Sequence, residues 1–405
     1  FPLKLKDLTY AVTLHLPEGP RFLLPPPVRF LARVRHHIYP SGGQQRIRQL
    51  VVPKRMAANG VPGANDDVVI NGNATTSLIT EGDITVKSFT VNGLSYIFGP
   101  GTLTVTENLD VRFPMFWQMT LVIAAGANAS MTDENASNGL TGITFYNDLV
   151  VNGNLVMESQ SFSGVKVIIN GVLTQSKAPD LHRSDKPGGA LNIDSPDLPV
   201  NIGKVVNKGT LNWQSGRLTS VNGPIINEGL WNISVEEETL GFGGFFQDSV
   251  IYNAGTIDLA PNVVSLSMTK RFVNTGTIQM HGATRLSLLA LDHYGVINGP
   301  AGAVLNIIGN YFDTGTTFHS GSTVDVSRLE TVNSSTLNLN EGCNISAVPN
   351  FFFGTGIVYL NTILPAAADY RVQAYVLTDI DQHFTGNFLL EGGAIDGNCT
   401  FSFDT

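Results

Sequence analysis

The sequence predicts an all-β solenoid in which parallel strands stack coil upon coil. Three observations favour this fold class. A short phrase of the form apolar–apolar–Asn–x–Gly recurs at long intervals, the composition suits short strands and tight turns, and no segment shows the apolar stripe of a long amphipathic helix. A mean coil of about 22 residues then predicts roughly a dozen coils between Asn71 and about residue 350.

The repeat is clearest in four phrases, whose asparagines are separated by 20, 26 and 21 residues. The phrases are VVNKGTLNW, IINEGLWNI, IYNAGTIDL and FVNTGTIQM, with Asn207, Asn227, Asn253 and Asn274 at the corner. We expect the glycine to supply a positive φ at this corner. Because the asparagine recurs in every coil, its amide is expected to bond the asparagines above and below it as a ladder.

The strand after each corner alternates, which assigns its side chains to two sides. Leu211, Ile257 and Ile278 are expected to stack inside in register, followed by a second row formed by Trp213, Leu259 and Met280. The residues between them are expected to point outward. Turns spaced this far apart favour parallel coils over hairpins, which reverse direction every 8–12 residues or so.

Composition and charge narrow the function classes. Charged residues make up only 14% of the chain, against about 25% in an average soluble protein. The net charge of −9 is uneven, because residues 1–57 hold ten Lys/Arg and two acids, whereas the remainder holds 14 Lys/Arg and 31 acids. An acidic body argues against a nucleic-acid partner. The uncharged stretch 113–132 is too polar for a membrane span.

Three regions are expected along the chain. Residues 1–57 form a basic N-terminal segment that is either a tether or a cap, and residues 58–350 form the coils. Residues 351–405 keep strands but lose the regular corner, which predicts a C-terminal capping β region that hides the last open edge. A separate small β-domain is the alternative for this region.

The pattern over residues 65–350, including the opening VPGANDDVVI and the later ITVKSFTVNG and GTLTV, resembles the right-handed parallel β-helix (pectin-lyase-like) superfamily, in particular its secreted, adhesin-like β-solenoids. The resemblance implies a right-handed parallel β-helix. Members include polysaccharide lyases, glycoside hydrolases, phage tailspikes and adhesins, so the fold alone does not choose a function.

The densest polar cluster, KAPDLHRSDKPGG at 177–189, interrupts the coil pattern and predicts a projecting loop. If the chain is an enzyme, its carboxylates could serve as acid, base or Ca²⁺ ligand, and its cation could stabilise negative charge. The catalytic candidates are Asp180, His182, Arg183 and Asp185. Against this role, the outward strand positions are mostly Asn, Thr, Ser and Gln, without a stack of acids.

Other motifs are sparse. The histidines are scattered and no metal-binding motif occurs, so no metal or other cofactor is expected, apart from Ca²⁺ in the lyase case. Cys343 and Cys399 form a candidate disulfide, with two unrelated thiols as the alternative. Candidate N-glycosylation sites are Asn73, Asn128, Asn135, Asn232, Asn333, Asn344 and Asn398.

The leading functional prediction is an extracellular structural or adhesive β-solenoid, secreted or at the cell surface. Its expected partners are glycans, extracellular matrix or surface components, and other copies of itself. The alternative is a carbohydrate-active enzyme, a polysaccharide lyase or glycoside hydrolase. A trimeric tail fibre or tailspike is the third hypothesis.

Overall fold

The computed structural model describes residues 62–404, apart from 71–75, 80–81, 93–94, 113–114, 133–142, 159–160, 164–165, 176–189, 194–203, 215–217, 221–223, 235–236, 241–249, 310–314 and 334. The chain divides into two units, Phe1–Arg46 and Ile47–Thr405, and every described residue belongs to the second. The predicted N-terminal segment, residues 1–57, therefore lies outside the description.

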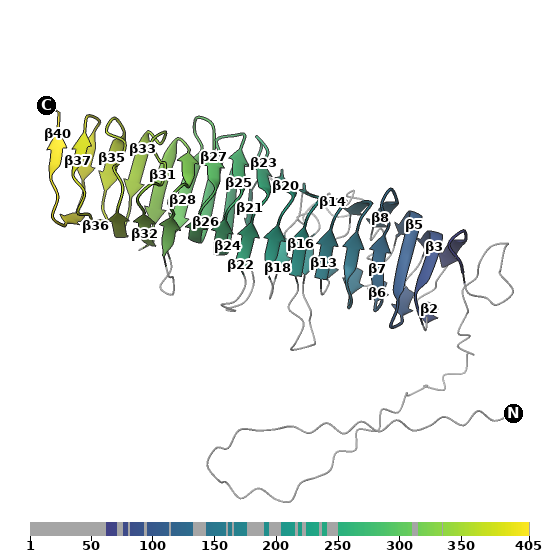
Figure 1. The fold of residues 1–405 in the computed structure, drawn as a ribbon. Helices are drawn as coiled ribbons and strands as arrows, with labels where there is room; N and C mark the ends of the chain where they lie inside the picture. Colours follow the sequence, from purple (N-terminus) through teal and green to yellow (C-terminus); the bar gives the residue numbers. More distant parts are fainter. Residues whose placement is uncertain are drawn as a thin grey trace, which may run out of the picture. The chain divides into compact units, whose positions relative to one another are not determined.

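The described chain winds through three faces of parallel strands, one after another in each coil (Figure 1). The first face contains the first halves of β3(Ile84–Val91) and β5(Thr102–Val111) and the second halves of β24(Ser265–Asn274) and β26(Arg285–His293). Its other strands are β7(Thr120–Ile123), β10(Leu149–Val151), β13(Lys166–Ile169), β16(Lys204–Asn207), β19(Ile225–Asn227), β22(Val250–Asn253), β29(Thr316–Phe318), β32(Ser335–Leu339), β34(Gly356–Leu360), β36(Tyr375–Leu377) and β39(Ala394–Asp396).

The second face follows the first around a tight corner. It contains the second halves of β3 and β5, together with β1(Asp67–Ile70), β8(Asn128–Thr132), β11(Asn154–Glu158), β14(Val172–Gln175), β17(Thr210–Trp213), β20(Leu230–Ile233), β23(Thr256–Leu259), β25(Thr277–Met280), β27(Val296–Asn298) and β30(Thr323–Asp325). Twelve strands are therefore stacked on this face, which confirms the prediction of roughly a dozen coils.

The third face closes each coil. Its first part is a separate sheet of β2(Thr76–Ile79), β4(Ser95–Phe98), β6(Met115–Trp117), β9(Ile143–Phe145), β12(Ser161–Ser163), β15(Ala190–Ile193) and β18(Leu218–Ser220). Its second part contains β21(Glu237–Leu240), the first halves of β24 and β26, β28(Val304–Ile308), β31(Arg328–Val332), β33(Asn350–Phe353), β35(Asp369–Val372) and β38(Phe388–Leu390). A separate pair, β37(Gln382–Phe384) with β40(Phe401–Phe403), follows β36 and β39 of the first face and therefore stands at the place of the second face in the last coils.

All assigned strand pairs are parallel, and no helix occurs among the described residues. The register aligns equivalent positions of the repeat, because Asn207 pairs with Asn227, Asn227 with Asn253, and Asn253 with Asn274. The predicted all-β parallel solenoid is confirmed.

The C-terminal region differs from expectation. Strands beyond residue 350 continue the same ladders, since β31 pairs with β33, β33 with β35, and β35 with β38. The boundary predicted between 58–350 and 351–405 is therefore absent from the strand pairing, and no distinct cap is seen in the described residues. The regular corner is lost from the sequence here, because Phe318, Leu339 and Leu360 take the register positions of the corner asparagines.

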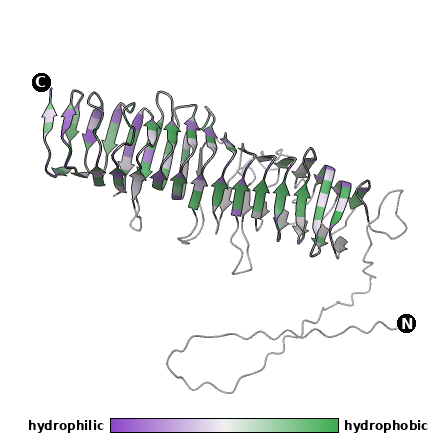
Figure 2. Cartoon of the chain, in the orientation of Figure 1, coloured by the Kyte–Doolittle hydropathy of each residue, from purple (hydrophilic) through white to green (hydrophobic). Residues whose placement is uncertain are grey.

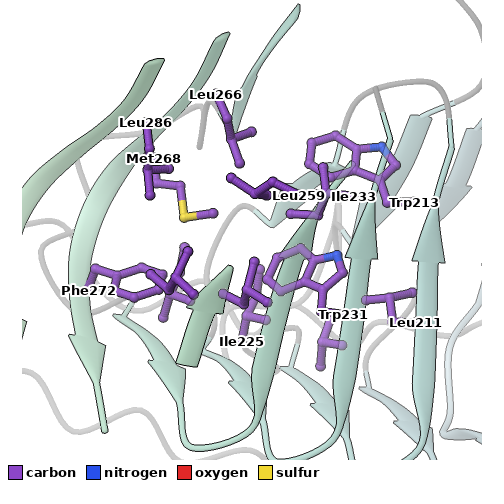
Figure 3. Packing of buried hydrophobic residues seen from close by; sticks show 14 of the residues in the cluster. Leu211, Trp213, Ile225, Trp231, Ile233, Leu259, Leu266, Met268, Phe272 and Leu286 are labelled. Atoms are coloured by element: carbon purple, nitrogen blue, oxygen red, sulfur yellow. The ribbon is translucent and has the colours of Figure 1, made fainter. Parts of the chain in front are cut away.

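The core consists of the inward side chains of each coil. Leu211, Trp231, Ile257 and Ile278 occupy one register row and are buried, whereas the residues that follow them are half-buried or exposed at the outer surface. Hydrophobic residues recur along the stacked strands (Figure 2), and Figure 3 shows Leu211 and Trp231 within the interior cluster. The alternation predicted for these strands is confirmed, and Trp231 belongs to the same row.

The predicted asparagine ladder is present, and it is buried. The Nδ2 of Asn207 donates to the Oδ1 of Asn227 at 2.7 Å, and the next two steps, to Asn253 and to Asn274, have the same length. All four side chains are at most 1% exposed. The second hydrogen of each of the first three amides reaches a backbone carbonyl one coil further on, for example that of Thr256 from Asn227 at 3.1 Å.

The corner glycine is needed for a different reason from the one predicted. Gly209, Gly229, Gly255 and Gly276 are not among the residues with a positive φ. Instead, a Cβ on any of them would overlap the carbonyl oxygen of a glycine in the preceding coil. The corners stack so closely that only a residue without a side chain fits.

We expect Asn253→Ala to lower the free energy of unfolding by about 3 kcal/mol, because it leaves the Nδ2 of Asn227 and the Oδ1 of Asn274 buried without their ladder partner. Urea denaturation followed by tryptophan fluorescence would measure this, since Trp231 and Trp213 are buried in the two preceding coils. The control is Asn212→Ala on the outer surface, with an expected loss below about 1 kcal/mol. Equal losses would contradict a special role for the buried ladder.

We expect Gly255→Ala to destabilise the solenoid by about 3 kcal/mol or more, because the new Cβ overlaps the backbone oxygen of Gly229 and neither backbone can move away without breaking the register. Gly82→Ala is the matched control, since a Cβ there meets no atom within 4 Å. Thermal unfolding of both variants would decide the point, and an unchanged midpoint for Gly255→Ala would contradict it.

Candidate functional site

The predicted catalytic loop joins β14 to β15, between the second and third faces. All four candidate residues lie in the segment 176–189, which is outside the described residues: Asp180, His182, Arg183 and Asp185. The description therefore begins with the surface beside this loop.

Beside this loop, the second face carries no charged side chain among the described outward positions of β11, β14 and β17. Val156, Thr174 and Asn212 occupy one outward row on successive coils. The Nδ2 of Asn212 donates to the Oγ1 of Thr174 at 3.0 Å, and the Nδ2 of Asn232 donates to the Oδ1 of Asn212 at 2.8 Å. We call this row, from Thr174 onward, the outer stripe. Its first three members, from Thr174 to Asn232, bond one another along the solenoid.

The outer stripe continues through two acids that are far apart. After Asn232, the successive residues in register are Asp258, Gln279, Asn298 and Asp325. Three strand spacings of about 4.8 Å separate the two aspartates, or about 14 Å. Paired carboxylates in glycoside hydrolases are about 5–9.5 Å apart. The two acids of the stripe are therefore too distant to form such a pair.

The first face carries a mixed cluster of aromatic and charged side chains, which we call the tyrosine–arginine cluster. It contains Tyr252, Arg271, Asp292, Tyr294 and His319, which come from β22, β24, β26 and the corners after β26 and β29. Arg271 donates to the Oδ2 of Asp292 through Nη2 at 2.6 Å and Nε at 3.1 Å. The rings of Tyr294 and His319 are stacked, with centroids 3.9 Å apart.

The electrostatics of this cluster are dominated by the Arg271–Asp292 pair. The hydrogen bond to the carboxylate raises the pKa of Arg271 above its ordinary value. The Nε2 of His319 lies 3.6 Å from the other oxygen of Asp292. Tyr252 and Tyr294 are 44% and 47% exposed. Exposed aromatic faces beside a held carboxylate and guanidinium can stack on a sugar ring and bond its hydroxyl groups.

The third face holds a buried carboxylate that is already paired. Glu330 accepts from the Nη2 of Arg285 at 2.5 Å and from the Nε of Arg328 at 2.8 Å, and it is 5% exposed. Both guanidinium groups occupy this carboxylate, and its pairing with Arg285 links the coils of β26 and β31.

The two cysteines do not form the predicted disulfide. Both thiols are free in the structure. Cys343 follows β32 and Cys399 follows β39, so three strand pairings separate them, or about 14 Å along the coils. A disulfide requires Cα atoms within about 7 Å. The alternative of two unrelated thiols is the one observed.

We expect Cys399 to react with a thiol reagent in the folded chain, because it is only partly covered, whereas Cys343 is buried and should react only after unfolding. Counting modified thiols with and without urea, by mass spectrometry under non-reducing conditions, would check this. Cys399→Ser, which removes the accessible thiol, is the control. A chain with no reactive thiol even in urea would show that a disulfide exists.

The candidate glycosylation sites differ in their surroundings. Asn128, Asn333, Asn344 and Asn398 are exposed, whereas Asn232 is half-buried within the outer stripe and its amide is bonded to Asn212. The remaining two candidates lie outside the described residues: Asn73 and Asn135. Whether these sites are modified stays a prediction.

The described residues also bear on metals and membranes. Among them, no group of three or more His, Cys, Asp or Glu side chains could hold a metal ion. In the same part of the chain, no helix is long and apolar enough to cross a bilayer. Candidate Ca²⁺ ligands from the loop at 177–189 lie outside this search.

The ladder position of His293 was not predicted, and in the sequence this residue is visible only as part of the small polar cluster Asp292–His293–Tyr294. The segment His293–Tyr294–Gly295 has the spacing of the Asn–x–Gly corner and begins 19 residues after Asn274. His293 is fully buried, with its Nδ1 3.2 Å from the Nδ2 of Asn274. The histidine thus takes the next ladder position, and the glycine two residues later was the signal that could have found it.

Comparison with known proteins identifies no relative of this chain. No protein-family model, no curated protein sequence and no solved structure matches this chain. The function of this chain is therefore inferred from the geometry of its coils.

Proposed function

We propose that this chain is an extracellular structural or adhesive β-solenoid whose outer faces bind glycans or matrix components. The observation that carries the proposal is the outer stripe, a row of mostly amide and hydroxyl side chains, some of them bonded to one another, in which the two acids Asp258 and Asp325 are about 14 Å apart. Such a row offers many hydrogen bonds to a long polar partner and lacks a pair of carboxylates for hydrolysis.

The tyrosine–arginine cluster supports the same proposal. Tyr252 and Tyr294 expose large ring surfaces, and Arg271 and Asp292 hold each other in a fixed orientation between them. Because Arg271 and Asp292 bond each other and the ring of Tyr294 is stacked on His319, binding a sugar there orders few further side chains. The proposal also includes the assignment to the right-handed, pectin-lyase-like superfamily and a secreted or cell-surface location.

We expect the purified chain to bind immobilised polysaccharides, and the double variant Tyr252→Ala/Tyr294→Ala to bind at least about 10-fold more weakly, because it removes both exposed rings. Tyr375→Ala is the matched control, since Tyr375 is a comparably exposed tyrosine of the first face outside the cluster. Glycan arrays followed by calorimetry on the best ligand would measure both.

The enzyme hypothesis is tested in the same screen. Incubation with acidic and neutral polysaccharides, with and without Ca²⁺, is expected to release no unsaturated products and no reducing ends. Turnover that is abolished by Asp180→Ala or Arg183→Ala would overturn the structural proposal. Absence of binding to any polysaccharide or matrix protein would overturn the adhesive part of it.

A further inference from the structure

His293 reproduces the hydrogen bonds of a ladder asparagine. Its Nδ1 lies 3.2 Å from the Nδ2 of Asn274, and its Nε2 lies 3.1 Å from the carbonyl oxygen of Thr323. In the preceding coils the same two interactions are made by an asparagine Oδ1, which accepts, and an asparagine Nδ2, which donates to a carbonyl one coil further on. Thr323 occupies the place that Thr277 has for Asn253.

The ladder has a direction, and this direction fixes the state of His293. The Oδ1 of Asn274 accepts from Asn253, so its Nδ2 must face His293 and donate to Nδ1. The Nδ1 is therefore unprotonated, and Nε2 carries the hydrogen that is donated to Thr323. The amides cannot simply turn over, because their Nδ2 groups also donate to backbone carbonyls, for example from Asn253 to Thr277.

We propose that His293 is an acid-sensitive lock on the asparagine ladder: uptake of a proton at Nδ1 places a donor against the donor of Asn274 and opens the coils between β22 and β30. Neutral asparagines elsewhere in the ladder cannot respond in this way. The lock would be closed near neutral pH and released in an acidic compartment or environment.

The groups around His293 do not offer the new proton another acceptor. Phe318, from β29, packs its ring against the imidazole with centroids 5.5 Å apart. The nearby charged or titratable groups are Arg271, Asp292, Tyr294 and His319. Asp292 lies in the outward row of the first face and is already bound by Arg271. A positive charge on His319 would disfavour a second positive charge on His293.

The pH range follows from the burial of the ring. Burial lowers the pKa of His293 from 6.5 to about 4. The unfolded chain therefore binds a proton at a higher pH than the folded one, so the stabilisation from neutral His293 is complete above pH 6.5 and is lost as the pH falls from 6.5 towards 4. The difference between the two pKa values, 6.5 − 4, sets an upper limit of about 300-fold on the increase in the opening equilibrium, a limit approached only well below pH 4.

The test compares the native chain with His293→Asn, which keeps both hydrogen bonds and cannot be protonated. Hydrogen exchange of peptides from β23 to β30 would be followed from pH 7 to pH 4.5, after correction for the intrinsic exchange rate. We expect opening of these coils to increase about 100-fold in the native chain and by less than about 5-fold in His293→Asn.

His281→Asn is the control, because His281 is an exposed histidine bound to Asp258, and this variant should keep the full acid response. Equal acid responses of the native chain and His293→Asn would overturn the proposal. Should His293→Asn fail to fold, NMR titration of the native imidazole decides the matter. An Nδ1 that stays unprotonated to below pH 5 supports the lock, and a ring that titrates near 6.5 overturns it.

Discussion

The structure depends on the direct stacking of one corner on the next. At Gly209, Gly229, Gly255 and Gly276 successive backbones approach so closely that a Cβ cannot be placed between them. This contact fixes the register of the coils, and the register in turn brings the corner asparagines within 2.7 Å of each other inside the solenoid. The buried amides are tolerable only because each finds its partner one coil away. The close stacking of the corners thus determines the positions of both the asparagine ladder and the apolar rows.

Much of this arrangement could be predicted from the sequence, because the signals are local and repeat. The Asn–x–Gly phrases predict the parallel coils, the inward rows and the ladder, all of which are present. The role of the glycine was predicted wrongly, since a single sequence shows that a residue lacks a side chain but not how close the next coil lies. The coils after residue 350 were missed because an apolar residue, Leu360, takes the register position of the corner asparagine there.

The candidate surfaces were harder to predict. The outer stripe and the tyrosine–arginine cluster bring together residues that are about 20 residues apart in the sequence. Which residues become neighbours is known only once the strand register is known. Arg271 and Asp292, for instance, belong to different coils and have no local motif in common. The ladder position of His293 was visible in principle, because Gly295 follows it at the corner spacing. A search restricted to asparagine could not find it.

The ladder also has a consequence for how such a chain can change in length. Its steps from Asn207 to Asn274 are chemically equivalent, so a whole coil could be duplicated or lost between them while every amide regains the same partners. The two ends are not equivalent to these steps. In the coil before Asn207 the register partner is Ile169, which leaves the Oδ1 of Asn207 without a hydrogen-bond partner. In the coil after Asn274 the ladder position is occupied by His293. Duplicating a coil within the ladder therefore keeps every amide hydrogen-bonded. Extending the ladder past either end would require a different side chain to pair with the terminal residue.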